Sequence, residues 1–135
     1  MENQTKKILI IDDDQEVVKQ VKNILTNNLD CTVDIAYNGK EGLDKMKENV
    51  SYDFIILAIL IPKLNGIEVC QAMIQNEKLK KIPVLLTSIL PLGSEAFRRS
   101  LEKFDEFSVV KCILDKPFTD EKLLNEVGKI INSNH

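Results

Sequence analysis

Apolar and polar positions along the chain follow two patterns, one typical of buried strands and one typical of amphipathic helices. Short runs rich in apolar residues predict five strands, at residues 8–11, 31–36, 54–57, 83–86 and 109–114. Four of these runs are almost continuously apolar, as in strands that are buried on both faces of a parallel sheet. The pattern therefore predicts a central parallel sheet with helices on both sides.

Between the strands, apolar residues recur at helical spacing. The expected helices carry their apolar residues within 17–25, 43–46, 67–74, 94–104 and 123–131. Asp14 and Thr119 stand where N-caps of the first and last helices are expected. Residues 103–109 fit either the end of a helix or a loop. Five strands alternating with five helices predict an α/β fold with right-handed crossovers, formed by one domain over residues 1–135 with its core at about 6–132.

Composition narrows the class of protein. The chain has 135 residues, 44% of them apolar and 29% charged, which suits one globular domain. A net charge of −3 argues against nucleic acid as the main partner, and no apolar run reaches the roughly 20 residues that span a bilayer. Cys31, Cys70 and Cys112 form no CxxC pair and look like reduced core thiols. We therefore expect a cytoplasmic protein with no direct nucleic-acid or membrane partner.

Chemically distinctive residues follow four of the five predicted strands. If the strand order is 2-1-3-4-5, these strands are neighbours, and ligands of such sheets bind beyond the carboxyl ends of the strands. Clustered carboxylates suit a hard cation such as Mg²⁺, whereas a hydroxyl and an ammonium group suit phosphoryl oxygens. The site therefore looks built for a phosphoryl group, although its centre lacks a nucleophile. The residues concerned are Asp12, Asp13, Asp14, Ala58, Thr87, Ser88 and Lys116.

With these residues, the chain strongly resembles the receiver domain of two-component response regulators. The resemblance covers nearly the whole chain and implies a flavodoxin-like (βα)5 sandwich with strand order 2-1-3-4-5. It also implies a signalling module and not an enzyme. The matching stretches are KILIIDDD at 7–14, YDFIILAILIPKLNG at 52–66, PVLLTS at 83–88 and KPF at 116–118.

The resemblance implies a Mg²⁺ site whose phosphoryl acceptor is missing. Asp12 and Asp13 match the acidic pair of the family, with Asp13 as the more direct ligand, and the backbone carbonyl of Leu60 matches a third metal contact. The phosphoacceptor Asp of the family falls on Ala58, and an alanine cannot form an acyl phosphate. We therefore expect that the chain cannot be phosphorylated in the family's way and that it binds Mg²⁺ weakly.

The resemblance also implies which residues face a phosphoryl group. Thr87, with Ser88 beside it, matches the switch hydroxyl, and Lys116 matches the ammonium group, whose bond to Pro117 is usually cis in the family. Ile113 stands where an aromatic switch residue is usual, so the coupled hydroxyl–aromatic movement is in question. Without a carboxylate at position 58, we expect Lys116 to turn toward Asp13 or solvent.

Two further departures from the family pattern bear on regulation. Leu60 and Ile89 occupy positions that tune the attack of water in the family, and apolar residues there predict a poor path for water. The span from Thr87 to Lys116 is longer than usual, with the extra residues in the helix and loop before the fifth strand. These residues fall close to a common docking face.

Three classes of function remain open at this point. The first is the receiver of a phosphorelay, silenced by an engineered or recent change at Ala58. It would pair with a sensor histidine kinase or phosphotransfer protein and act on a downstream target or a missing effector domain, and it could form a homodimer. The second is a naturally degenerate pseudo-receiver that acts as an adaptor. The third, a haloacid dehalogenase-type phosphatase, has Asp12 and Asp14 in its favour but Glu16 and the lack of a later acidic pair against it.

Overall fold

The computed structural model describes residues 5–49, 51–89 and 108–133. The described strands are β1 (Lys6–Ile11), β2 (Cys31–Ala36), β3 (Phe54–Ala58), β4 (Val84–Ser88) and β5 (Val110–Asp115). The described helices are α1 (Gln15–Asn28), α2 (Gly39–Glu48), α3 (Gly66–Ile74) and α5 (Asp120–Ser133), with a 3-10 turn at Leu79–Lys81. All five predicted strands are confirmed, with ends that differ by at most two residues. The helix predicted at 94–104 lies outside the described residues.

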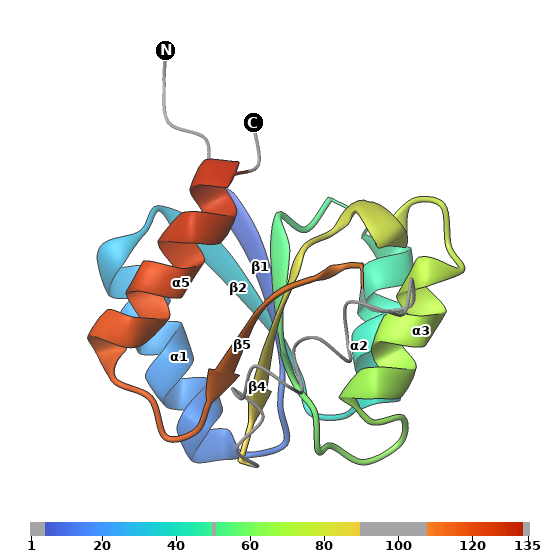
Figure 1. The fold of residues 1–135 in the computed structure, drawn as a ribbon, viewed down its shortest axis with the longest axis horizontal. Coiled ribbons are helices and arrows are strands. Elements are labelled where there is room, and N and C mark those ends of the chain that lie inside the picture. Colours follow the sequence, from blue (N-terminus) through green and yellow to red (C-terminus); the bar gives the residue numbers. More distant parts are fainter. Residues whose placement is uncertain (1–4, 50, 90–107, 134–135) are drawn as a thin grey trace.

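The five strands form one parallel sheet in the order β2-β1-β3-β4-β5, which confirms the predicted flavodoxin-like topology. Helices α1 and α5 cover one face of the sheet, and α2 and α3 cover the other (Figure 1). Because every strand is parallel, all carboxyl ends lie at the same edge. The register pairs Ala58 at the end of β3 with Thr87 on β4. This edge therefore gathers the residues that follow β1, β3, β4 and β5.

The continuous apolar run of β1 is explained by burial on both faces of the sheet. Ile8 and Ile10 belong to the apolar cluster that contains the buried residues of α1 and α5. Leu9 and Ile11 belong to the other cluster, with the buried residues of α2 and α3. Burying each of these side chains contributes about 1.5–3 kcal/mol. The sheet therefore gives the site a rigid base.

The loop that leaves β3 is held against the start of α2. The amides of Gly39 and Lys40 donate to the carbonyls of Pro62 and Lys63, at 3.1 Å and 2.8 Å. A Cβ atom at Gly39 would lie 1.9 Å from the carbonyl oxygen of Leu64, so only glycine permits this approach. The loop also contains two non-glycine residues with positive φ, Lys63 at 52° and Leu64 at 81°. The α2 contact thus holds a strained loop in one place.

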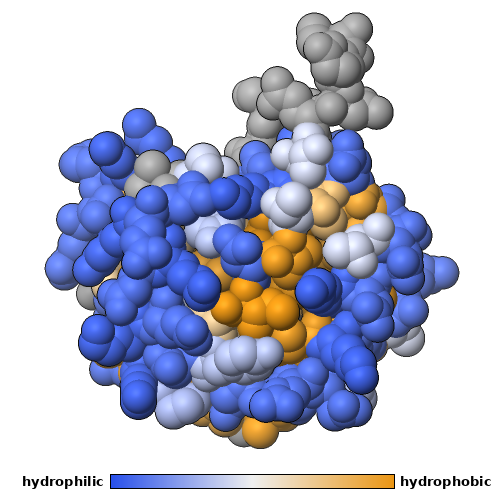
Figure 2. Space-filling model, turned by 180° about the vertical axis from the view of Figure 1, so that it is seen from behind, coloured by the Kyte–Doolittle hydropathy of each residue, from blue (hydrophilic) through white to orange (hydrophobic). Residues whose placement is uncertain are grey.

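Strand β2 forms one edge of the sheet and lies on the side away from the view of Figure 1. Seen from behind, the molecule shows apolar residues at the middle of its surface, with hydrophilic residues around them (Figure 2). Cys31, Val33 and Ile35 of β2 are half-buried and pack on the core. Asp34 on the same strand accepts a 2.5 Å hydrogen bond from the Tyr52 hydroxyl. Burial and this bond raise the pKa of Tyr52 well above its usual range.

None of the three cysteines forms a disulfide bond. Cys70 on α3 is buried, and burial raises its pKa to about 12. In the described part of the chain, no helix is both long enough and apolar enough to cross a membrane.

We expect the Cys70 thiol to resist alkylation in the folded protein, because the thiolate is the reactive form and burial disfavours it. Cys31 and Cys112 are half-buried and are expected to react first. Peptide mapping by mass spectrometry after iodoacetamide treatment gives the rate at each position. Alkylation of Cys70 as fast as that of Cys31 would contradict its burial.

Candidate functional site

The residues that follow β1, β3, β4 and β5 line one cavity of about 270 Å³ at the carboxyl edge of the sheet. The structure thus brings together all the residues that the sequence analysis placed at this site. The lining consists of Asp12, Asp13, Asp14, Ala58, Leu60, Thr87, Ser88, Ile89 and Lys116.

Asp12 directly follows β1 and is 3% exposed. Its backbone amide donates to the carbonyl of Ala36 at 3.1 Å, which continues the β1–β2 pairing beyond the strand. Its carboxylate accepts two hydrogen bonds: Oδ1 from the Asp14 amide at 3.0 Å, and Oδ2 from Lys116 Nζ at 2.6 Å. The Asp12 side chain is therefore held in one orientation from both sides.

The ion pair between Lys116 and Asp12 corrects the expectation for the lysine. We expected Lys116 to turn toward Asp13 or solvent, but its ammonium lies 2.6 Å from Asp12, and the two side chains are only 12% and 5% exposed. Asp13 is exposed, so its carboxylate is hydrated by water. An ammonium group withdrawn from water needs an anion at the same depth, and Asp12 is that anion.

Position 116 itself is fixed by the backbone. The amide of Lys116 donates to the carbonyl of Ser88 at 2.7 Å, which ties the end of β5 to the end of β4. The peptide bond between Lys116 and Pro117 is cis, as the resemblance implied.

Asp14 has a structural role at the start of α1. Its Oδ1 accepts hydrogen bonds from the amides of Glu16 and Val17, at 3.0 Å and 3.3 Å, so it is the N-cap of the helix, as predicted. Of the three consecutive carboxylates, Asp12 and Asp13 therefore remain as candidate metal ligands.

Thr87 and Ser88 end β4 and are almost fully buried, at 1% and 2% exposure. Within the described residues, Thr87 Oγ1 has no hydrogen-bond partner. A buried hydroxyl without a partner costs about 1–3 kcal/mol and is uncommon in folded proteins. Since Thr87 lines the cavity, its hydroxyl is suited to a ligand oxygen.

Ala58 ends β3 and is 2% exposed. Its backbone is closely packed, because a Cβ atom at Gly66 would lie 2.6 Å from the Ala58 carbonyl oxygen. Asn65 and Glu68 form a capping box at the start of α3, which fixes that helix next to the end of β3. The side chain at this position is therefore well placed on the cavity wall, yet it ends in a methyl group.

The donor atoms of the cavity are chemically suited to Mg²⁺, but they are few. In residues 5–49, 51–89 and 108–133, no group of three or more His, Cys, Asp or Glu side chains is arranged to hold a metal ion. The lining contains the carboxylates of Asp12 and Asp13, together with that of Asp14, whose Oδ1 caps α1. Mg²⁺ commonly binds one or two carboxylates and keeps several waters, so this hard oxygen set fits the ion.

Two apolar side chains stand at the edge of the cavity. Leu60 is 51% exposed and Ile89 is 66% exposed, and both belong to its lining. They occupy the positions for which the resemblance predicts a poor path for water, and this stays a prediction.

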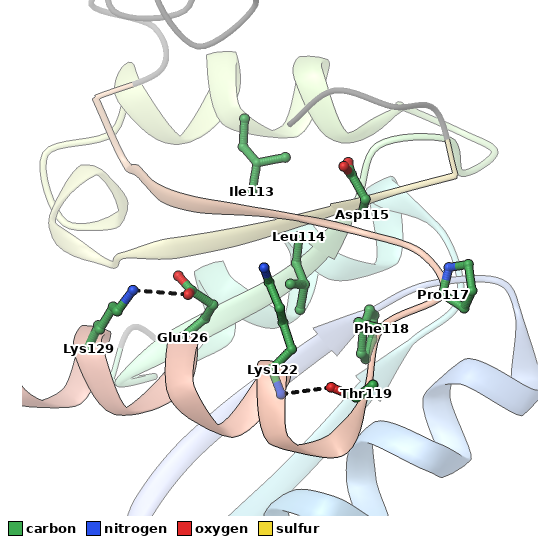
Figure 3. A pocket seen from close by; sticks show the side chains of 9 residues that line it. All are labelled: Ile113, Leu114, Asp115, Pro117, Phe118, Thr119, Lys122, Glu126 and Lys129. Carbon is green, nitrogen blue, oxygen red and sulfur yellow. Dashed lines mark hydrogen bonds and ion pairs between the residues drawn. The ribbon is translucent and has the colours of Figure 1, made fainter. Parts of the chain in front are cut away.

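A second cavity, of about 580 Å³, lies between β5 and α5 (Figure 3). Its walls carry charges of both signs, and Glu126 accepts hydrogen bonds from the Cys112 thiol at 3.0 Å and from Lys129 at 3.1 Å. These two bonds lower the pKa of Glu126. The sequence analysis did not predict this cavity, because no motif marks a space that arises from the packing of a strand against a helix.

The fold and the cavity at the carboxyl edge of the sheet indicate the class of protein, and sequence comparison identifies it. The chain belongs to the response regulator receiver domain family, whose sequence model matches residues 8–128. Receiver domains are signalling domains of two-component systems, and they interact with histidine kinases or phosphotransfer proteins.

Individual relatives support this assignment. The chain is 37% identical over 127 residues to the response regulator ArlR of Staphylococcus aureus, an alignment that covers 93% of the chain and 52% of the relative. It is 33% identical over 125 residues to a CpxR homolog of Haemophilus influenzae, with 93% and 50% covered. The chain thus spans about half the length of these curated relatives.

A solved structure that is similar to this chain contains Mg²⁺ and BeF3. The match is the CheX–CheY–BeF3–Mg²⁺ complex of Borrelia burgdorferi, with a TM-score of 0.80 and 26% identity. The alignment covers 93% of this chain and 89% of that chain.

Proposed function

We propose that this chain is a receiver domain in which Ala58 occupies the phosphoryl-accepting position, so that it cannot be phosphorylated in the family's way. The observation that carries the proposal is the place of Ala58. It ends the central strand β3 and lines the same cavity as Asp12, Thr87 and Lys116. A methyl group has no lone pair with which to attack phosphorus, so a site otherwise furnished for a phosphoryl group has no nucleophile at this position.

The other residues of the cavity have separate roles in this proposal. Asp12, Asp13 and the backbone carbonyl of Leu60 would hold Mg²⁺, which when bound neutralises charge on phosphoryl oxygens. The Thr87 hydroxyl, which is buried without a hydrogen-bond partner among the described residues, would donate to a phosphoryl oxygen. Lys116 would supply a positive charge to another oxygen.

The test of the proposal is exposure of the chain to a phosphoryl donor. The protein is incubated with Mg²⁺ and a small acyl phosphate, and its intact mass is recorded by mass spectrometry. We expect no gain of mass, because no carboxylate stands at the end of β3. A gain of one phosphoryl group that maps to any residue of the cavity would contradict the proposal.

The partners that follow from this proposal are a sensor histidine kinase or a phosphotransfer protein on the input side. On the output side we propose either a downstream protein or an effector domain, because the matched relatives are about twice as long as this chain. In this account residues 1–135 form one receiver domain. Homodimer formation is a further proposal, to be tested by sedimentation.

The second candidate is a pseudo-receiver that acts as an adaptor without phosphorylation. The ion pair between Lys116 and Asp12 favours it, because the charges of the cavity partly satisfy one another without an acceptor carboxylate. Such an adaptor would bind its partner equally well with and without Mg²⁺ and BeF3. A silenced receiver, in contrast, would bind its partner with an affinity that depends on Mg²⁺ and BeF3 once a carboxylate stands at position 58.

We expect the Ala58→Asp variant to bind Mg²⁺ about tenfold more tightly than the parent chain, because a third carboxylate joins the hard oxygen donors of the cavity. Titration calorimetry gives both affinities. Ile89→Asp is the matched control, since it adds the same charge at a cavity residue that is 66% exposed. Equal affinities for the parent and Ala58→Asp would contradict the proposed metal site.

A further inference from the structure

We propose that Lys116 is an internal counter-ion that keeps the metal site closed: its ammonium holds the Asp12 carboxylate, and a divalent cation binds there only after the ammonium leaves. This inference rests on the proposed metal site of Asp12 and Asp13. It concerns how access to that site is controlled in a chain with alanine at position 58.

Both carboxylate oxygens of Asp12 accept hydrogen bonds from the protein. One oxygen accepts from the Asp14 amide at 3.0 Å, and the other accepts from Lys116 Nζ at 2.6 Å. Each oxygen of this candidate ligand therefore accepts one hydrogen bond and keeps a further lone pair. A cation that binds Asp12 meets the charged ammonium beside the carboxylate, and repulsion between the two cations favours displacement of a donor. The Asp14 amide belongs to the chain turn at the start of α1, whereas the lysine side chain has several rotatable bonds, so the ammonium is the donor that moves.

The ion pair between Lys116 and Asp12 is largely buried. The side chains of Lys116 and Asp12 are 12% and 5% exposed, so water screens their charges only weakly. At a separation of 2.6 Å, the ammonium neutralises the carboxylate, and an incoming divalent cation meets a positive charge instead of an acidic pair. The ammonium and the metal ion are attracted to the same carboxylate and repel each other. The affinity of the site for the metal is therefore lowered by the free energy needed to move Lys116.

Ala58 leaves Lys116 without an alternative anionic partner at the end of β3. It lines the same cavity and offers a methyl group, so it supplies no carboxylate that could take the ammonium away from Asp12. A substitution that removes an acceptor thus has two effects on the metal site. It removes one anionic group, and it leaves Lys116 paired with a remaining one.

The test compares Mg²⁺ titrations of the parent chain and the Lys116→Met variant by two-dimensional amide NMR, which also shows whether the variant is folded. We expect Lys116→Met to bind Mg²⁺ about tenfold more tightly than the parent, because the competing charge is gone. Lys111→Met is the matched control: Lys111 lies on β5, which ends one residue before Lys116, and it is exposed and outside the cavity lining. It is expected to change the affinity less than about twofold, since exposed charges are well screened.

The Ala58→Asp variant separates the failure of this inference from that of the proposed site. If Ala58→Asp binds Mg²⁺ and Lys116→Met binds no more tightly than Lys111→Met, the counter-ion inference is wrong while the metal site stands. If none of these proteins binds Mg²⁺, the proposed metal site is wrong and the inference falls with it.

A measurement on the parent chain covers the case in which Lys116→Met does not fold. The Cε resonance of Lys116 is followed during the Mg²⁺ titration. We expect it to shift with the same midpoint as the Asp13 amide, because the ammonium leaves as the metal arrives. An unchanged Lys116 resonance at a Mg²⁺ concentration that saturates the Asp13 shift would overturn the inference.

Discussion

The Leu57→Ala variant is expected to lose about 2–5 kcal/mol of unfolding free energy. Leu57 is fully buried on β3, and its neighbours across the sheet are Ile11 on β1 and Leu86 on β4. Removing most of its side chain leaves a space enclosed by strands on both sides, and such a space cannot collapse easily. Urea denaturation followed by circular dichroism gives the change.

Leu60→Ala is the matched control for this prediction, because it makes the same substitution three positions later. Leu60 is 51% exposed at the edge of the cavity, so truncation creates no enclosed space. We expect its effect to stay within about 0.5 kcal/mol. Similar losses for the two variants would mean that β3 is not the central strand of a packed sheet.

The contrast between these two leucines also shows what the sequence could predict. Leu57 lies in a continuous apolar run, which is the pattern of a strand buried on both faces. The position of Ala58 at the end of that strand followed from the same run. Once the strand order was inferred, the meeting of Asp12, Thr87 and Lys116 at one edge followed from the geometry of parallel sheets. This part of the site was therefore predictable from pattern and topology.

The pairing inside the cavity was not predictable in the same way. Lys116 and Asp12 are 104 positions apart in the sequence, and Asp13 is adjacent to Asp12, so spacing does not favour one aspartate. The choice depends on burial: Asp12 is 3% exposed, whereas Asp13 is exposed. Small differences in the direction of two neighbouring side chains decide such a pairing, and only coordinates show them.

Contacts between loops were also beyond sequence patterns. Glycine is required at position 39 because the carbonyl of Leu64 approaches it closely from the β3–α3 loop. The cavity beside Glu126 arises in the same manner, from how β5 and α5 happen to pack. Neither feature has a local sequence motif.

The second large effect is expected from Ala58→Asp. The parent chain should take up no phosphoryl group, whereas each molecule of the variant should take up a single phosphoryl group. The new carboxylate would stand at the end of β3, in a cavity that already contains the Thr87 hydroxyl and the Lys116 ammonium. A carboxylate at position 58 also gives Lys116 an alternative partner to Asp12, which opens the proposed metal site. Acceptor and cation site would thus be restored by one substitution.

Ile89→Asp tests whether the place of the new carboxylate matters. It adds the same group to the cavity lining, but at its exposed edge. We expect no phosphoryl uptake by this variant. Adding Asp13→Asn to Ala58→Asp is expected to reduce uptake strongly, because it removes a proposed metal ligand.

The intact mass of Ala58→Asp after incubation with Mg²⁺ and a small acyl phosphate tests the central claim most directly, with the parent chain treated in parallel. We expect the variant to gain the mass of one phosphoryl group only when Mg²⁺ is present, and the parent to gain nothing. A folded Ala58→Asp protein that remains unmodified would contradict the claim that the cavity lacks only its acceptor.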